Sequence, residues 1–245
     1  MRPINVTNKF LPGITWLEAS ACGFIIGDHI DVWSVEVNPA ASNTDELLAI
    51  ISSDELARAN RFYQQKDRDR FITSRWALRN IVGKYIGAQP TEVEFEAGKN
   101  KKPHIKNAGL NLHYNLSHSG KHILLAVAGS VIGVDIEFID NNFGYSEVLA
   151  DNFSAAEVIH INERDQISRF FKLWTRKEAI TKATAQGLDC DLRLLPGLDG
   201  VHKVESGVIA SDADWVINSF IIDERYAASI AHAPAINRIA FYKLA

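Results

Sequence analysis

Residues 131–138 read Val-Ile-Gly-Val-Asp-Ile-Glu-Phe, an apolar and β-branched run that contains two acids. The run predicts a β-strand, and because strand side chains alternate between faces, Asp135 and Glu137 point to the same side. Two neighbouring carboxylates repel each other, and burial would raise their pKa values unless a cation lies between them. Their hard oxygen atoms suit magnesium. The other interpretation is an amphipathic strand with a solvated polar face, and the strand alone leaves both open.

The length and composition of the chain indicate an ordinary globular protein. Its 245 residues are 47% hydrophobic, enough for one large domain or two small ones. Cys22 and Cys190 have no Cys-x-x-Cys spacing, which argues against a disulfide framework or a structural zinc site and favours the cytoplasm. We expect no signal peptide and no membrane anchor, because no stretch reaches the roughly 18 apolar residues of a membrane span.

The net charge of −4 is unevenly distributed along the chain. Residues 56–84 contain eight Lys or Arg against two Asp, a formal charge of +6 that leaves −10 for the remainder. This segment predicts a local anion-binding face on an acidic protein. Nucleic acid is not the expected partner, because a duplex binder usually carries a basic surplus overall.

Hydrophobic periodicity and turn residues predict a mixture of helices and strands. We expect strands at 30–37, 112–117, 122–128, 131–138, 201–209, 215–222, 227–231 and 236–242, helices at 43–51, 52–62, 67–87 and 166–185 and from 153 onward, and loops at 98–106 and 141–145. The final strands are expected to form an antiparallel finish. Each half has a basic, tryptophan-bearing helix closed by glycine, which is a faint internal repeat.

A capping box, with Ser52 three residues ahead of Glu55, predicts the start of the helix at 52–62. The helix predicted at 67–87 comes next along the chain. Arg75 and Arg79 are four residues apart and share one side of this helix. Either they form a solvated basic face, or they belong to the anion-binding face.

The helix predicted at 166–185 has an acid where its pattern requires an apolar residue. Its core stripe consists of Ile167, Phe170, Phe171 and Trp174. The next position on the stripe is Glu178, followed by Lys182. Such a local inconsistency is typical of functional sites. The alternative is a helix that turns toward solvent, with Glu178 and Lys182 as an i, i+4 pair.

Two catalytic interpretations of the histidine-bearing strands fail. Ser117 and His118 are adjacent on a strand and face opposite sides, so His118 cannot activate Ser117 as a nucleophile. A zinc site at His113, His118 and His122 lacks the cysteines or the His-Glu-x-x-His spacing that would support it.

Five ordered motifs together resemble the phosphopantetheinyl transferases of the Sfp type, in the holo-acyl-carrier-protein synthase superfamily. They are Arg-Phe-Tyr at 61–63, Lys-Pro at 102–103, Asn-Leu-Ser-His-Ser at 115–119, Gly-Val-Asp-Ile-Glu at 133–137, and Trp-Thr-Arg-Lys-Glu-Ala at 174–179 with Lys182. Their order and spacing extend the resemblance from about residue 30 to about residue 230.

The resemblance implies an α+β fold of two similar subdomains related by a pseudo-twofold axis, each an antiparallel sheet packed by a long helix. We place the boundary between residues 1–129 and residues 130–245, with the metal site in the second part. Coenzyme A would lie in the cleft between the two halves, and we expect the protein to be a monomer.

The resemblance also implies three sets of site residues. The ligands of a magnesium ion on the coenzyme A pyrophosphate would be Asp135, Glu137 and Glu178. The residues that contact coenzyme A would be Arg58, Lys102, Pro103, Ser117, His118 and Lys182. Of these, Arg58 and His118 would meet the ribose phosphate, and Lys182 the pyrophosphate. The catalytic residues would be Glu178, Lys182 and Asp135.

Two acids stand apart from this assignment. Glu157 matches an acid near the family's active site, but a capping box with Ser154 would also explain it. Glu55 stands where relatives place a basic residue ahead of Arg58, so the ribose phosphate could instead be bound by Arg70 or Arg75.

The implied activity is transfer of phosphopantetheine from coenzyme A to a serine of an apo acyl or peptidyl carrier protein, which gives the holo-carrier. Such carriers serve fatty acid, polyketide or nonribosomal peptide biosynthesis. Glu178 could act as a metal ligand or as the base, directly or through a water. The alternative is a catalytically inactive coenzyme A-binding or carrier-docking homologue.

Overall fold

The computed structural model describes residues 2–40, 45–98, 102–106, 111–187 and 190–244. The strands are β1 Pro3–Phe10, β2 Trp16–Glu18, β3 His29–Glu36, β4 Phe95–Ala97, β5 Pro103–Ile105, β6 His113–Ser119, β7 His122–Ala128, β8 Ile132–Phe138, β9 Gly200–Glu205, β10 Trp215–Ile222, β11 Tyr226–His232 and β12 Arg238–Leu244. The helices are α1 Asp45–Ile50, α2 Ser53–Ala59, α3 Gln65–Ile86, α4 Ser146–Asn152, α5 Ala155–Glu163 and α6 Gln166–Thr184.

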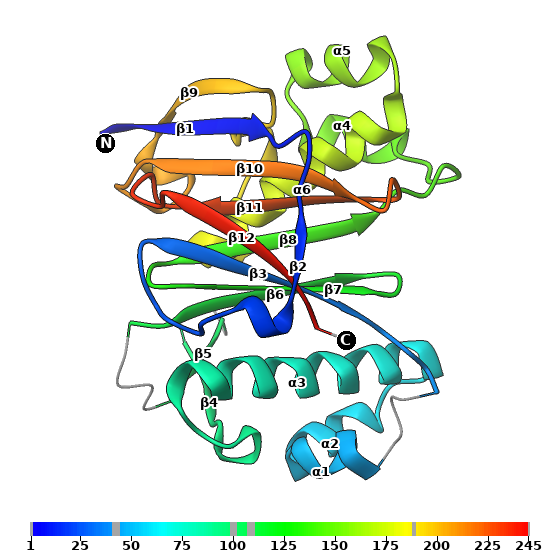
Figure 1. Ribbon diagram of the computed structural model, residues 1–245. Helices are drawn as coiled ribbons and strands as arrows, with labels where there is room; N and C mark the ends of the chain where they lie inside the picture. Colours follow the sequence, from blue (N-terminus) through cyan, green and yellow to red (C-terminus); the bar gives the residue numbers. More distant parts are fainter. Residues whose placement is uncertain (1, 41–44, 99–101, 107–110, 188–189, 245) are drawn as a thin grey trace.

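Two five-stranded sheets form the centre of the molecule, each with a long helix on its outer side (Figure 1). One sheet has the order β8-β11-β10-β1-β9 and is covered by α6, and the other has the order β2-β12-β3-β7-β6 and is covered by α3. A small sheet, β4-β5, completes the fold. The expected α+β fold of two similar halves is therefore confirmed, and the faint repeat corresponds to the two long helices. Neither five-stranded sheet is purely antiparallel as expected, because each contains a parallel pair.

The first strand, β1, joins the sheet formed mainly by the second half of the chain. The last strand, β12, joins the sheet formed mainly by the first half. β1 pairs in parallel with β10, and β12 runs parallel to both β2 and β3. The expected antiparallel finish is thus correct for β10 and β11 but wrong for β12. A tight turn at Asp223 and Glu224, both with positive φ, folds β11 back on β10, whereas the segment after β11 carries the chain to the other sheet. The boundary between residues 1–129 and 130–245 stays a prediction.

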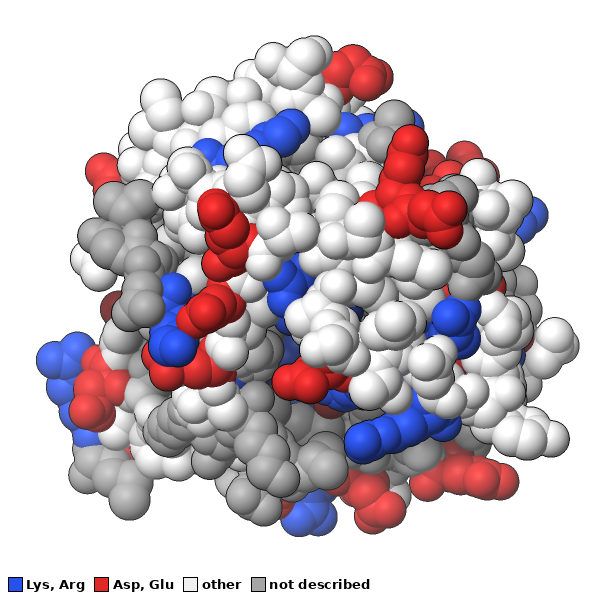
Figure 2. All heavy atoms as spheres, turned by 90° about the horizontal axis from the view of Figure 1, so that it is seen from below, with Lys and Arg blue, Asp and Glu red and all other residues white. Residues whose placement is uncertain are grey.

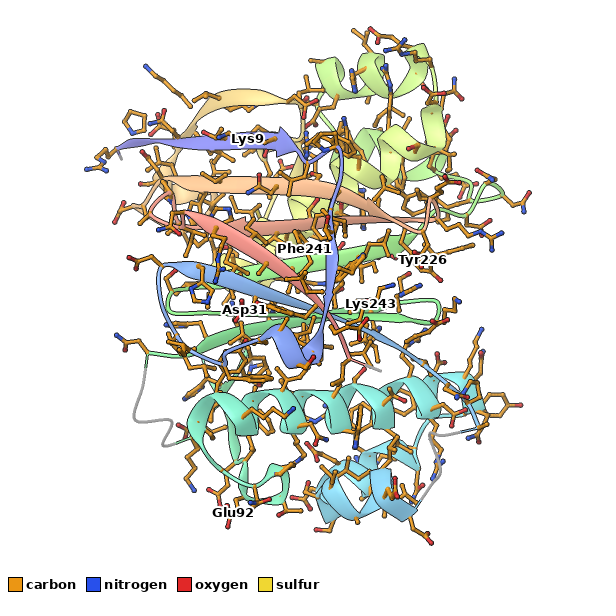
Figure 3. The ribbon with its side chains drawn as sticks, viewed as in Figure 1. Lys9, Asp31, Glu92, Tyr226, Phe241 and Lys243 are labelled. Carbon is orange, nitrogen blue, oxygen red and sulfur yellow. The ribbon has the colours of Figure 1, made fainter. Side chains whose placement is uncertain are left out.

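The hydrophobic layer between the sheets determines where the acids of β8 point. Ile132, Val134 and Ile136 are fully buried in this layer, which also contains side chains from β3, β7, β10, β11 and β12. Figure 3 labels two of its aromatic members, Tyr226 of β11 and Phe241 of β12. Because side chains alternate along a strand, the intervening residues of β8 face the opposite side, toward α6.

Gly133 allows α6 to approach β8 very closely. A Cβ atom at this position would lie 2.0 Å from the carbonyl oxygen of Ala179 and 2.5 Å from the backbone nitrogen of Ala183. Only glycine fits such a contact without moving the helix. The close approach brings the middle of α6, with Glu178 and Lys182, over the acidic side of β8.

Several elements differ from the expectations. The strand β1 and the short helix α4 were not anticipated, and part of the loop expected at 98–106 is β5, which pairs with β4. The strand expected at 112–117 extends to Ser119, the last residue of β6. The helix expected at 43–51 is observed as α1, and its first two residues, with 99–101 of the expected loop, lie outside the described residues.

The basic segment is partly neutralised by acids from its own surroundings. Glu55 forms the expected capping box with Ser52 and also binds Arg75 and Arg79, so the solvated-face alternative for these arginines is wrong. Seen from below, on the side of α1 and α2, Lys and Arg side chains are interspersed with Asp and Glu (Figure 2).

Two further expectations concern the cysteines and membranes. Cys22 and Cys190 are both free, as their spacing indicated. Among the described residues, no helix is long and apolar enough to cross a membrane.

Candidate active site

The site is built where edge strands of the two sheets meet. β6 and β8 lie side by side but are joined through side chains rather than by a backbone ladder. The backbone N–H of Val134 donates to Asn115 Oδ1 (2.7 Å), and that of Phe138 donates to Ser119 Oγ (3.0 Å). We call this junction, residues 115–119 against 134–138, the seam.

Asp135 is at the centre of the seam and is only 2% exposed. Its Oδ1 accepts hydrogen bonds from Ser117 Oγ (2.9 Å) and from Lys182 Nζ (2.6 Å). Burial raises the pKa of Asp135, while the Lys182 ammonium opposes this effect. The solvated-strand interpretation is therefore wrong. The proposed i, i+4 pair is also replaced, because Lys182 pairs with Asp135 instead of Glu178.

Glu137 and Glu178 share the electrostatic field of Asp135. Glu137 Oε2 accepts a hydrogen bond from Ser119 Oγ (2.9 Å). Burial, followed by the charge of Asp135, raises the pKa of Glu137 to about 7. The same two causes raise the pKa of Glu178. Both glutamates are thus close enough to Asp135 for its charge to disfavour their ionised forms.

A cavity of about 430 Å³ lies beside Glu178 and Lys182. It is bounded by β6, α6, the end of α4 and the segment that follows residue 190. Its lining includes Lys102, Pro103, Asn115, Asp151, Glu178, Thr181, Lys182 and Asp191. The cavity therefore joins residues that are far apart in the sequence, from both halves of the chain.

The Lys102 ammonium is bound to backbone oxygens within the protein, whereas the resemblance implied that Lys102 contacts coenzyme A. Its Nζ donates to the backbone oxygens of Ile132 (3.0 Å), Lys182 (2.8 Å) and Ala183 (3.1 Å), which uses all three of its protons. Burial lowers its pKa to about 8. The Lys102 ammonium thus ties the start of β8 to the end of α6, and the remainder of the residue lines the cavity with Pro103.

The residues expected at the ribose phosphate lie on the neighbouring elements. Arg58 is exposed on α2, with its guanidinium carbon 5.2 Å from the ring centre of Phe71. His118 is exposed near the end of β6, and Arg70 donates to the Gly120 oxygen (3.4 Å) in the turn just beyond it. Of the two arginines considered as substitutes, Arg70 thus lies beside this turn, whereas Arg75 is bound to Glu55.

Glu157 is accounted for by contacts outside the cavity. It is 2% exposed and forms the expected capping box with Ser154. Its Oε1 accepts from the Gly197 N–H (2.6 Å), and its Oε2 accepts from Lys177 Nζ (3.0 Å). These bonds tie α5 to α6 and to the segment before β9, which gives Glu157 a structural role.

The donor set fits magnesium. Asp135, Glu137 and Glu178 offer only carboxylate oxygens, and Asp135 Oδ2 is buried without a hydrogen-bond partner in the described structure. An unpaired buried carboxylate oxygen is costly, and a bound cation would satisfy it. Within the described ranges, no group of three or more Asp, Glu, His or Cys side chains is already arranged to hold a metal ion.

Asn115 and Ser119 join β6 to β8 at the seam, a contribution that was not predicted from the sequence. Both were quoted within a motif, but neither was assigned a function. The signal was present as the alternation of Asn115, Ser117 and Ser119, which places three polar side chains on one face of β6.

The fold and the site together define a two-halved α+β protein with a cluster of buried acids and Lys182 beside a cavity lined from both halves. Residues 35–130 match the family model described as 4′-phosphopantetheinyl transferase, N-terminal, and residues 131–231 match that of the 4′-phosphopantetheinyl transferase superfamily.

Curated proteins agree with these matches. The 4′-phosphopantetheinyl transferase HetI of Nostoc sp. is 31% identical over 89% of this chain and 94% of its own length. A 4′-phosphopantetheinyl transferase of Bacillus subtilis is 30% identical over 62% of this chain and 68% of its own. The 4′-phosphopantetheinyl transferase Sfp of Bacillus subtilis strain 168 is 26% identical over 60% and 66%. The chain belongs to the 4′-phosphopantetheinyl transferase superfamily and is an enzyme of this class.

Proposed function

We propose that the protein transfers the phosphopantetheine group of coenzyme A to a serine of an apo acyl or peptidyl carrier protein, in a magnesium-dependent reaction. The products are the holo-carrier and adenosine 3′,5′-bisphosphate. The observation that carries this proposal is the convergence of Asp135, Glu137, Glu178 and Lys182 at the seam, beside a cavity lined from both halves.

The reaction requires a proton acceptor and a means to stabilise negative charge. The serine oxygen of the carrier forms a bond to the phosphorus that bears the pantetheine arm, the bridging P–O bond breaks, and the bisphosphate leaves. Magnesium held by Asp135, Glu137 and Glu178 would neutralise charge on the pyrophosphate. Lys182 supplies a fixed positive charge at the same place, held there by Asp135 and Ser117.

Glu178 is the residue best suited to take the serine proton. It lines the cavity, and burial together with the Asp135 charge raises its pKa, which makes its carboxylate a better base near neutral pH. Asp135 is less suited, because its Oδ1 is already engaged by Lys182 and Ser117.

Coenzyme A would extend across the cleft between the halves. We assign its ribose phosphate to Arg58, His118 and Arg70, and its nucleotide to the surface formed by Lys102, Pro103 and Ser117. Because the ribose phosphate is remote from the reacting phosphorus, loss of Arg58 or His118 should raise the Michaelis constant for coenzyme A more than it lowers turnover.

A mass assay tests the proposed function. The protein is incubated with coenzyme A, magnesium and each of a panel of apo acyl and peptidyl carriers, and each carrier is weighed by mass spectrometry. We expect at least one carrier to gain one phosphopantetheine group, and the gain to disappear with EDTA. If no carrier gains mass, the proposed function is wrong.

The inactive-homologue alternative predicts coenzyme A binding without transfer in the same assay. The comparisons give it no support, because the curated relatives carry transferase names.

We further propose that the protein is a cytoplasmic monomer. Size-exclusion chromatography with light scattering tests the monomer.

A further inference from the structure

Two serines of β6 match the two acids of β8 one for one across the seam. Ser117 Oγ donates to Asp135 Oδ1 (2.9 Å), and Ser119 Oγ donates to Glu137 Oε2 (2.9 Å). Both serines are on the face of β6 that meets β8, because they are two residues apart, as are the acids. The register of the two edge strands therefore gives each carboxylate its own hydroxyl donor.

Each hydroxyl group is oriented by a second hydrogen bond. Lys182 Nζ donates to Ser117 Oγ (2.9 Å), and the backbone N–H of Phe138 donates to Ser119 Oγ (3.0 Å). A serine hydroxyl carries a single proton. With its oxygen already accepting from an N–H, it directs that proton to the carboxylate.

The two acids differ in how much they depend on their serine. Asp135 is buried and is also held by Lys182. Glu137 is less buried, has a longer side chain, and is repelled by the charge of Asp135. The hydrogen bond from Ser119 opposes this repulsion directly, and the charge of Lys182 opposes it to a smaller degree. Without the bond from Ser119, Glu137 would be free to turn toward solvent, where its charge is better hydrated.

We propose that Ser119 is a positioning residue that holds the Glu137 carboxylate near Asp135 at the seam, where Glu137 would help Asp135 and Glu178 to bind a magnesium ion. This inference rests on the proposed function, because it assumes that the three acids bind the metal of the transfer reaction. Ser119 itself contacts neither the metal nor coenzyme A. Partners that orient metal ligands typically contribute about 10- to 100-fold in metal affinity.

The test compares Ser119→Ala, which removes the hydroxyl, with Ser119→Thr, which keeps it. Magnesium is titrated by calorimetry into protein saturated with coenzyme A, without carrier, so the readout is binding and not turnover. Ser154→Ala is the matched control. Its hydroxyl accepts from the backbone N–H of Glu157 (3.4 Å) at the start of α5, outside the seam.

We expect Ser119→Ala to weaken magnesium binding by about 10-fold or more and Ser119→Thr to restore it. We expect Ser154→Ala to lower the melting temperature, through loss of the helix cap, without changing magnesium affinity. Wild-type affinity in Ser119→Ala would overturn the inference, as would the absence of magnesium binding by the wild-type protein. If Ser119→Ala does not fold, Ser119→Cys replaces it, because a thiol is a weak donor of similar size, and the same weakening is expected.

The outcome also separates this inference from the proposed function. A wild-type protein that binds magnesium in a Ser119-dependent way but modifies no carrier would refute the transfer reaction and leave the positioning role standing. A protein that modifies a carrier, while Ser119→Ala binds magnesium as tightly as wild type, would refute only the positioning role.

Discussion

Replacement of Glu55 by alanine should destabilise the first half of the protein far more than an ordinary helix substitution. Glu55 closes the capping box of α2 by accepting from the Ser52 N–H (2.9 Å), and it binds the guanidinium groups of Arg75 and Arg79 on α3. The side chains of the acid and the two arginines are 11%, 18% and 6% exposed, respectively. The substitution would leave two largely buried cations without their acid.

The magnitude follows from these contacts. The N-cap itself is kept in the variant, because Ser52 Oγ accepts from the backbone N–H of residue 55. Removal of one partner from a buried ion pair typically costs about 3 to 5 kcal/mol. Arg79 keeps bonds to the backbone oxygens of Pro90 and Val93, and Arg75 keeps some solvent contact, so we take the lower end. We expect Glu55→Ala to lose about 3 kcal/mol, which lowers the melting temperature by roughly 6 to 12 °C for a chain of this size.

The contribution of Glu55 to the free energy of unfolding should also depend on pH. Burial opposes ionisation of Glu55, but Arg75 and Arg79 outweigh it and lower its pKa below the ordinary 4.5. An acid with a lowered pKa stabilises the folded state above its unfolded pKa and loses this contribution as pH falls through the folded value. The difference in free energy of unfolding between wild type and Glu55→Gln should therefore be largest at pH 7 and should shrink below about pH 4.5.

Urea denaturation followed by circular dichroism measures both effects. Asp54→Ala is the control, because Asp54 is exposed in the same first turn of α2 and should cost little. If Glu55→Ala were no less stable than Asp54→Ala, the contacts of Glu55 with Ser52, Arg75 and Arg79 would not stabilise the folded protein.

Three further results are expected. Glu178→Gln should lower carrier modification by at least ~10²-fold with coenzyme A binding retained, as measured by single-turnover mass assays, and wild-type rates would exclude it as the base. Gly133→Ala should prevent stable folding, because its Cβ would lie 2.0 Å from the Ala179 oxygen, and soluble expression with a wild-type melting temperature would contradict this contact. Burial lowers the pKa of Lys102 from 10.5 to about 8, so the unfolded chain binds more protons between these values. Wild-type stability should therefore rise relative to Lys102→Met across that pH range, and a pH-independent difference would refute the shift.

Local patterns in the sequence were sufficient for most elements and for the identity of the acids. The alternation at 131–138 predicted both the strand and the common face of Asp135 and Glu137. Both capping boxes, at Ser52 and Ser154, were correct. These features depend on contacts within a few residues, so a short stretch of sequence is sufficient to predict them.

Tertiary structure alone decided which distant segments meet. Lys182 could have paired with Glu178 one turn away, but the close packing of α6 on Gly133 places it against Asp135, 47 positions earlier in the chain. The exchange of β1 and β12 between sheets and the pairing of β6 with β8 through side chains are likewise invisible to local periodicity. A strand pattern specifies which face is buried, but it does not specify the neighbouring strand, because many partners satisfy the same alternation. The residue types of the site were therefore set by the sequence, and their partners by the packing of two sheets whose edge strands meet.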